Sequence, residues 1–242
     1  MEYVINSNHK PDCSLQSVLF NHQDRLFDCH SKLLMLRVDF AYRKNSDSYA
    51  YGDIHQLAAE MTWLTEQCAE ISGLEGYAWV MEYGGDHRYH IHAAFYINGQ
   101  SHRKAWCFWK AIQSLWEDIT DGEGYAHRCE PKGHYRVRGE RVINFSDRRG
   151  REGMQYILSY LGKQSQRTER RIYRVSAVPA PAVSGRRRTE ANHYRYRHRR
   201  YHRHADVTRQ YFSLHHGVVD NRADSSGNGS GRGLSHDGGG DY

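Results

Sequence analysis

Two histidines separated by a single residue, His90 and His92, constrain this 242-residue chain more than any other feature. Side chains two positions apart point the same way on a β-strand, where successive side chains alternate between the two faces. Aromatic and β-branched residues surround the pair, and the run ends at the turn signal Asn98-Gly99. The pattern therefore predicts a strand that presents two imidazoles on one face.

A second strand precedes this one. Residues 78–83 are mostly apolar or aromatic, and the glycines that follow them are a strong turn signal. A hairpin closed by residues 84–88 would pair Tyr83 with Tyr89, Glu82 with His90, and Val80 with His92. Glu82 would then share a face with both imidazoles. Two nitrogens and one carboxylate oxygen form a half-open site for a divalent cation, so we predict Glu82, His90 and His92 as metal ligands.

The remaining elements predict an α+β domain with a central antiparallel β-sheet flanked by helices. Strands are expected at 31–42, 78–83, 89–97, 125–129, 135–138 and 142–145, and helices at 53–72, 102–119 and 150–164, with a further helix around 15–27. Asp53, Ser101 and Ser146-Asp147 precede the three main helices as N-cap candidates. Gly73 stands where the first of these helices should end.

The strand at 31–42 is apolar on both sides near its start, which is typical of a central strand covered on both faces. Asp39 lies on this strand. It could assist a metal or a base, but a hydrogen bond at the edge of the core is the favoured interpretation. His127, Cys129 and His134 suggest a zinc site only weakly, because their spacing fits no standard pattern.

The basic character of the chain belongs to one segment. The net charge is +6, and residues 186–204 contain eight arginines and one glutamate, so the remainder is close to neutral. Residues 221–242 are rich in glycine, and such a segment cannot bury enough apolar surface to order itself. We therefore predict a basic, then Gly/Ser-rich, largely disordered tail at 167–242. Its arginines and tyrosines suit phosphate neutralisation and base stacking, although a merely solvated extension is an equal alternative.

The cysteines and the hydropathy point to a cytoplasmic protein. The five cysteines are odd in number, scattered, and without a CxxC pair. No secretory signal is recognisable at the start of the chain, and no apolar run approaches the length of a membrane span. We expect reduced thiols, a cytoplasmic location and no membrane partner.

The last predicted helix carries a second set of reactive groups. Tyr156, Tyr160 and Lys163 are spaced so that they lie on one helix face, about one turn apart. A phenol is a weak nucleophile because it keeps its proton until about pH 10, and it improves when a cation or base lies near the oxygen. A metal that polarises a phosphodiester, with a lysine that stabilises charge, would complete a phosphoryl-transfer site. Taken alone, however, both tyrosines are better read as core residues of an amphipathic helix.

These two motifs resemble those of the HUH endonucleases, which include rolling-circle replication initiators and relaxases. His90-Ile91-His92 is similar to their paired-histidine motif, and the segment from Tyr156 to Lys163 is similar to their two-tyrosine motif. Order and spacing most resemble the inovirus-type replication proteins, a family that also covers prophage-borne YagK/YfjJ-type C-terminal domains. The resemblance covers residues 30–166, and residues 1–29 form a poorly defined N-terminal segment.

The resemblance implies a metal-dependent endonuclease that nicks and rejoins single-stranded DNA at a specific site. Mg²⁺ or Mn²⁺ would bind Glu82, His90 and His92, while Tyr160, Tyr156 and Lys163 would be catalytic, with Tyr160 as the first nucleophile. A 5′-phosphotyrosine link and a free 3′-OH would initiate rolling-circle replication of a filamentous phage, prophage or related mobile element. The implied partners are single-stranded DNA or a nicked origin, and the host helicase and polymerase.

Two alternatives remain. The same fold could be catalytically silent and act as a prophage-borne DNA-binding regulator. A cupin-type oxygenase also places His-x-His on a strand, but the three predicted helices do not suit a double-stranded β-barrel.

Overall fold

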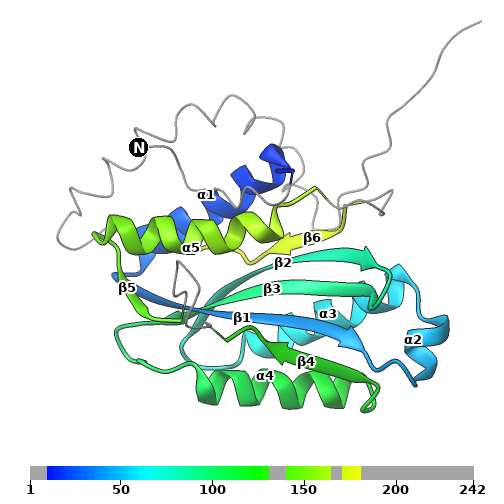
Figure 1. Cartoon of the computed structure of the whole chain (residues 1–242). Helices are drawn as coiled ribbons and strands as arrows, with labels where there is room; N and C mark the ends of the chain where they lie inside the picture. The colour runs from blue at the N-terminus through cyan, green and yellow to red at the C-terminus, as the bar shows by residue number, and fades with distance from the viewer. Residues whose placement is uncertain (1–9, 131–139, 165–170, 181–242) are drawn as a thin grey trace, which may run out of the picture.

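A computed structural model of the protein describes residues 10–130, 140–164 and 171–180 (Figure 1). Its centre is an open six-stranded sheet in the order β4-β1-β3-β2-β6, with β5 also paired to β1, and every pairing is antiparallel. The strands are β1 (Lys32–Tyr42), β2 (Leu74–Gly84), β3 (Arg88–Asn98), β4 (Gly124–Arg128), β5 (Val142–Asn144) and β6 (Tyr173–Val175). The helices are α1 (Cys13–Cys29), α2 (Asp47–Tyr51), α3 (Ile54–Cys68), α4 (Trp106–Ile119) and α5 (Arg148–Leu161). The predicted α+β class and antiparallel sheet are confirmed.

Helices cover both faces of the sheet, α1 and α5 on one side and α3 and α4 on the other (Figure 1). Strand β1 lies inside the sheet, and its alternate residues serve two cores. Leu34, Leu36 and Phe40 pack with α3 and α4, whereas Leu33 and Met35 pack with α1 and α5. The expectation of a strand buried on both faces is therefore confirmed.

Two elements outside the predicted 30–166 unit belong to the same fold. Helix α1 buries Leu19 and Leu26 against the sheet, and β6 pairs with β2. Strand β6 is too short, and has too few alternating apolar residues, for its sequence to predict a strand. It forms because its backbone pairs with β2. The folded unit thus includes residues on both sides of the predicted range.

The predicted start of the second main helix, after Ser101, is wrong. Helix α4 begins at Trp106 with Ala105 as N-cap. Residues 99–101 form a turn instead, in which the amide of His102 donates to the carbonyl of Asn98, and the His102 ring packs against Phe108. Tertiary contacts thus replace the local capping signal.

The other helix ends agree more closely with the sequence. Asp53 and Asp147 cap α3 and α5 through their carboxylates, as expected. Helix α3 ends at Cys68, four residues before the predicted end, and the chain then turns at Gly73 with a φ of +90°. A Cβ at Gly73 would meet the His102 ring at 2.5 Å, so this turn requires glycine.

Several predictions fall outside the described residues: the strand at 135–138, most of the tail at 167–242, and His134. Helix α2, with Ser46 as its N-cap, lies between the predicted strand at 31–42 and the predicted helix at 53–72, where no element is predicted. None of the described helices has the length and apolar character needed to cross a membrane. All five cysteines are unpaired, consistent with the expectation of reduced thiols.

Candidate metal centre and tyrosine helix

The hairpin of β2 and β3 has the predicted register. Glu82 lies opposite His90, Val80 opposite His92, and Tyr83 opposite Tyr89. Side chains alternate between the two faces along both strands, and a tight turn joins the strands. Together these features determine which residues lie opposite each other. Glu82, His90 and His92 consequently point to the sheet face covered by α1 and α5.

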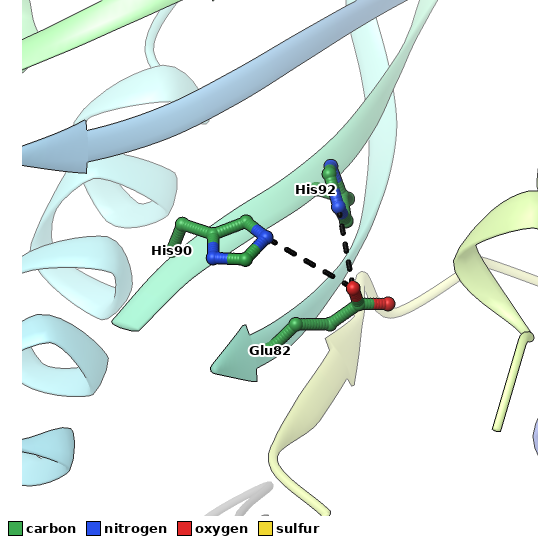
Figure 2. Close-up of side chains that lie close together, drawn as sticks. All are labelled: Glu82, His90 and His92. Atoms are coloured by element: carbon green, nitrogen blue, oxygen red, sulfur yellow. Dashed lines mark ion pairs between the residues drawn. The ribbon is translucent and has the colours of Figure 1, made fainter. Parts of the chain in front are cut away.

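These three side chains meet at one point (Figure 2). Glu82 Oε2 lies 3.4 Å from His92 Nε2 and 3.9 Å from His90 Nε2. One ligand atom from each residue lies within 4.8 Å of the others, and Glu82 and His92 are each only 5% exposed. Among the described residues, this is the group of His, Cys, Asp and Glu side chains that could hold a metal ion.

The orientation of both imidazoles suits that purpose. His92 Nδ1 lies 2.6 Å from Asp39 Oδ1, and His90 Nδ1 lies 3.1 Å from the carbonyl oxygen of Arg88. A proton on each Nδ1, donated to these acceptors, leaves the lone pair of each Nε2 facing Glu82. Glu82 Oε1 is buried and has no hydrogen-bond partner among the described residues, and the buried His92 Nε2 faces only Glu82 Oε2, at 3.4 Å. The donor set and these two atoms fit a divalent cation.

The electrostatics of the group depend on its neighbours. Burial lowers the pKa of His92, but the hydrogen bonds and charges of Asp39 and Glu82 outweigh burial and raise it. Burial raises the pKa of Glu82, yet His92 and Lys163 outweigh that effect and hold it below its usual value. The pKa of His90 is lowered by burial and by the charge of His92. A cation bound to Glu82 and the two imidazoles would displace any proton from His92 Nε2.

Lys163 connects this group to the tyrosine helix. Its Nζ lies 2.9 Å from Glu82 Oε2 and 4.0 Å from the centroid of the Tyr160 ring. Burial lowers the pKa of Lys163, but the hydrogen bonds and charges of Glu82 and Tyr160 outweigh it and raise the pKa. The end of α5 is held in place because the Asp12 amide donates to the carbonyl of Gly162 and the Gln164 amide donates to that of Lys10.

The two tyrosines of α5 are placed differently. The Tyr160 ring lies 5.2 Å from the His92 ring, measured between centroids, and Arg37 Cζ lies 5.6 Å from the centroid of Tyr160. Tyr156 is half-buried and makes no such contact with the described residues of the metal group. Of the two tyrosines, the structure thus brings Tyr160 to the metal group.

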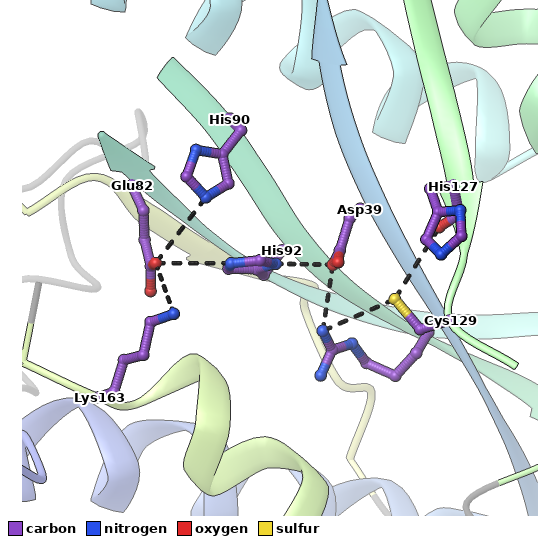
Figure 3. A network of polar contacts seen from close by, with 8 residues as sticks. Asp39, Glu82, His90, His92, His127, Cys129 and Lys163 are labelled. Carbon is purple, nitrogen blue, oxygen red and sulfur yellow. Dashed lines mark hydrogen bonds and ion pairs between the residues drawn. The ribbon is translucent and has the colours of Figure 1, made fainter. Parts of the chain in front are cut away.

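Asp39 continues the network away from the metal group (Figure 3). Its Oδ1 also accepts a hydrogen bond from Arg37 Nη2 at 3.1 Å, and Asp39 lies opposite His92 on one side and His127 on the other. Burial raises the pKa of Asp39, but His92 and Arg37 outweigh it and lower the pKa well below its usual range. The hydrogen bond expected for Asp39 is thus present, and one of its partners is a candidate metal ligand.

Sequence reasoning could not assign this role to Asp39, because the pairing of β1 with β3 joins residues 53 positions apart. Alternation within β1 places Asp39 on the same side as Met35, but it gives no register to a distant strand. Comparisons with protein-family models, curated proteins and solved structures found no match.

Proposed function

We propose that this protein is a metal-dependent endonuclease that nicks and rejoins single-stranded DNA through a 5′-phosphotyrosine intermediate. The observation that carries this proposal is the position of Tyr160 and Lys163 against the group of Glu82, His90 and His92. A nucleophile and a cation from the end of α5 thus meet a metal-ligand set from the β2–β3 hairpin. The spacing of the two motifs in the sequence supports the same interpretation.

The chain's own residues would divide the work as follows. The Tyr160 oxygen attacks the phosphorus and loses its proton, while the bond from phosphorus to the 3′ oxygen breaks and that oxygen leaves as a 3′-OH. Lys163 stabilises the negative charge that develops beside the phenol in the transition state. A divalent ion, Mg²⁺ or Mn²⁺, on Glu82, His90 and His92 would polarise the phosphate. Attack of a 3′-OH on the phosphotyrosine reverses the reaction and rejoins the strand.

Tyr156 has a secondary place in this scheme. It lies one helical turn before Tyr160, so a second transfer would require the DNA or the helix to shift. We propose Tyr160 as the first nucleophile and Tyr156 as the acceptor of a later strand. The free 3′-OH would prime rolling-circle replication of a filamentous phage, prophage or related element, with a host helicase and polymerase as partners.

Trapping of a covalent adduct tests the proposal. The full-length protein is incubated with Mn²⁺ and a pool of single-stranded phage-origin oligonucleotides, and denaturing gels report protein joined to DNA. We expect an adduct with the wild type and with Tyr156→Phe, and none with Tyr160→Phe, with the double variant, or without metal. An adduct that persists in the double variant, or that forms in the presence of EDTA, would overturn the assignment.

One observation favours a second candidate, a DNA-binding regulator without catalysis. The Lys163 ammonium already pairs with Glu82 and neutralises a carboxylate that a metal would need. If this pair excludes metal, the protein would bind DNA without cleaving it. Isothermal titration of the wild type with Mn²⁺ separates the candidates: binding that His92→Ala abolishes supports the nuclease, and no binding supports the regulator.

A further inference from the structure

The molecule exposes two tryptophans, Trp63 on α3 and Trp106 at the start of α4, at 53% and 51%. Their surroundings differ. Lys110 Nζ and Arg128 Cζ each lie 5.6 Å from the centroid of the Trp106 ring. No cation of the described residues lies over the Trp63 ring in the same way. Proteins that bind single-stranded nucleic acids often present an exposed aromatic ring among cations. Bases stack on the ring, and the positive charges attract the phosphates.

Charge around Trp106 supports this chemistry. Arg103 and Lys104 precede it, Lys110 follows one turn later, and all three are exposed. Two carboxylates also lie nearby: Glu140 accepts from Arg128 Nε at 3.1 Å, and Glu130 lies 3.0 Å from its Nη1. They hold the guanidinium of Arg128 in place beside the indole, while the three exposed cations leave the patch net positive.

The sheet connects this patch to the candidate metal centre. A row of facing residues crosses the sheet from His92 on β3 through Asp39 on β1 to His127 on β4. Two strand spacings make this distance about 10 Å. Strand β4 is the edge of the sheet, and Arg128, the next residue, points to the opposite face and meets Trp106. A DNA strand bound at the metal centre can thus reach the patch by passing over β1 and around the edge strand β4.

We propose that Trp106, with Arg103, Lys104, Lys110 and Arg128, forms a stacking platform for a single-stranded DNA segment that flanks the reacting phosphate. The platform rests on the proposed function for its choice of DNA as partner. It adds a binding surface on the face of the sheet opposite the metal group. Trp106 would take a base on its exposed ring, and the cations would follow the backbone.

Paired variants of the full chain test the platform. Fluorescence anisotropy measures the Kd for a labelled oligodeoxythymidylate, without metal, for the wild type, Trp106→Ala, Trp106→Phe and Trp63→Ala. We expect Trp106→Ala to raise Kd about tenfold, Trp106→Phe to restore most of the affinity, and Trp63→Ala to change it less than twofold. The two alanine variants lose equally exposed indoles, and both keep the arginine-rich segment, so its contribution to binding cancels in the comparison.

Salt dependence separates stacking from charge. Trp106→Ala should leave the slope of log Kd against log salt unchanged, whereas Lys104→Gln should reduce it by about 0.7. Equal Kd values for Trp106→Ala and Trp63→Ala, or a wild type that binds no oligonucleotide, would overturn the platform. Adduct formation is scored separately at saturating DNA. A wild type that binds through Trp106 but forms no adduct refutes the nuclease and leaves the platform standing.

Discussion

Helices α3 and α4 cover one face of the sheet with apolar side chains, whereas the face beneath α1 and α5 mixes apolar side chains with polar and charged ones. Buried polar atoms that lack a hydrogen-bond partner show the difference. Among the described residues, the α3/α4 face has only the indole nitrogens of Trp79 and Trp116. The described residues of the α1/α5 side have such atoms on His22, Gln23, Arg37, Glu82, His92, Tyr96 and Gln155.

This difference indicates that one face of the sheet contributes mainly to stability and the other holds the groups that can react. Burial of apolar area stabilises a fold, whereas a buried polar atom without a partner costs free energy. Such atoms are retained where a ligand, an ion or a water molecule uses them. The α3/α4 face therefore acts as the stable support, and the α1/α5 face carries the reactive groups.

The largest effect is expected from damage to the support. Phe40 is fully buried and packs edge-on against Phe95 and Trp116. Phe40→Ala should lower the free energy of unfolding by about 3–5 kcal/mol through lost burial and a cavity. Urea denaturation measures this loss. A change below 1 kcal/mol would show that the α3/α4 face is not the main source of stability.

The second prediction concerns the metal group. Asp39→Asn removes the charge that orients and polarises His92, so Mn²⁺ affinity should fall about tenfold to a hundredfold, or about 1.4–2.8 kcal/mol. Isothermal titration measures the affinity. Asp121→Asn is the matched control, because Asp121 is exposed and its φ of +47° suits asparagine. Equal affinities for the two variants would remove Asp39 from the site.

Sequence reasoning succeeded at the hairpin and failed at contacts between distant elements. Turn glycines and alternation fixed the register of Glu82 with His90, and the Asp53 and Asp147 carboxylates marked two helix starts. Local pattern could not reveal the bond from His92 to Asp39 or the ion pair of Lys163 with Glu82, because strand order and helix docking set both.

Buried His22 gives a third, smaller effect. Burial and the charge of Arg25 lower its pKa to about 3 from 6.5, while a hydrogen bond with Ser176 opposes them. Above pH 6.5 the imidazole is neutral in both states, so it contributes no pH dependence. Between pH 6.5 and 3 the unfolded chain binds a proton that the folded chain does not. Stability should therefore fall as the pH drops, by about 1 kcal/mol between pH 6.5 and 5.5.

Denaturation of the wild type and His22→Gln at several pH values isolates this contribution. Carboxylates such as Glu82 also lose their stabilising contacts as the pH falls, but they do so in both proteins. The stability of the wild type relative to the variant should fall as the pH drops below 6.5. A difference that stays constant would mean that His22 gains a proton without cost.

The smallest effect is expected at Tyr96. Its hydroxyl is buried and has no hydrogen-bond partner in the part of the chain that the structure describes, and burial holds the phenol in its neutral form by raising its pKa. Tyr96→Phe removes only this oxygen, so unfolding free energy should change by less than about 1 kcal/mol or rise. Calorimetry measures the shift. A loss above 2 kcal/mol would show that the hydroxyl has a partner and would weaken the contrast between the two faces.

Peptide mapping of the covalent adduct tests the central claim most directly. The adduct formed by the full chain with Mn²⁺ is digested with nuclease and protease, and mass spectrometry locates the remaining phosphonucleotide. We expect it on Tyr160, which lies beside His92 and Lys163. A phosphonucleotide found only on Tyr156, or no adduct with any origin oligonucleotide, would contradict the account.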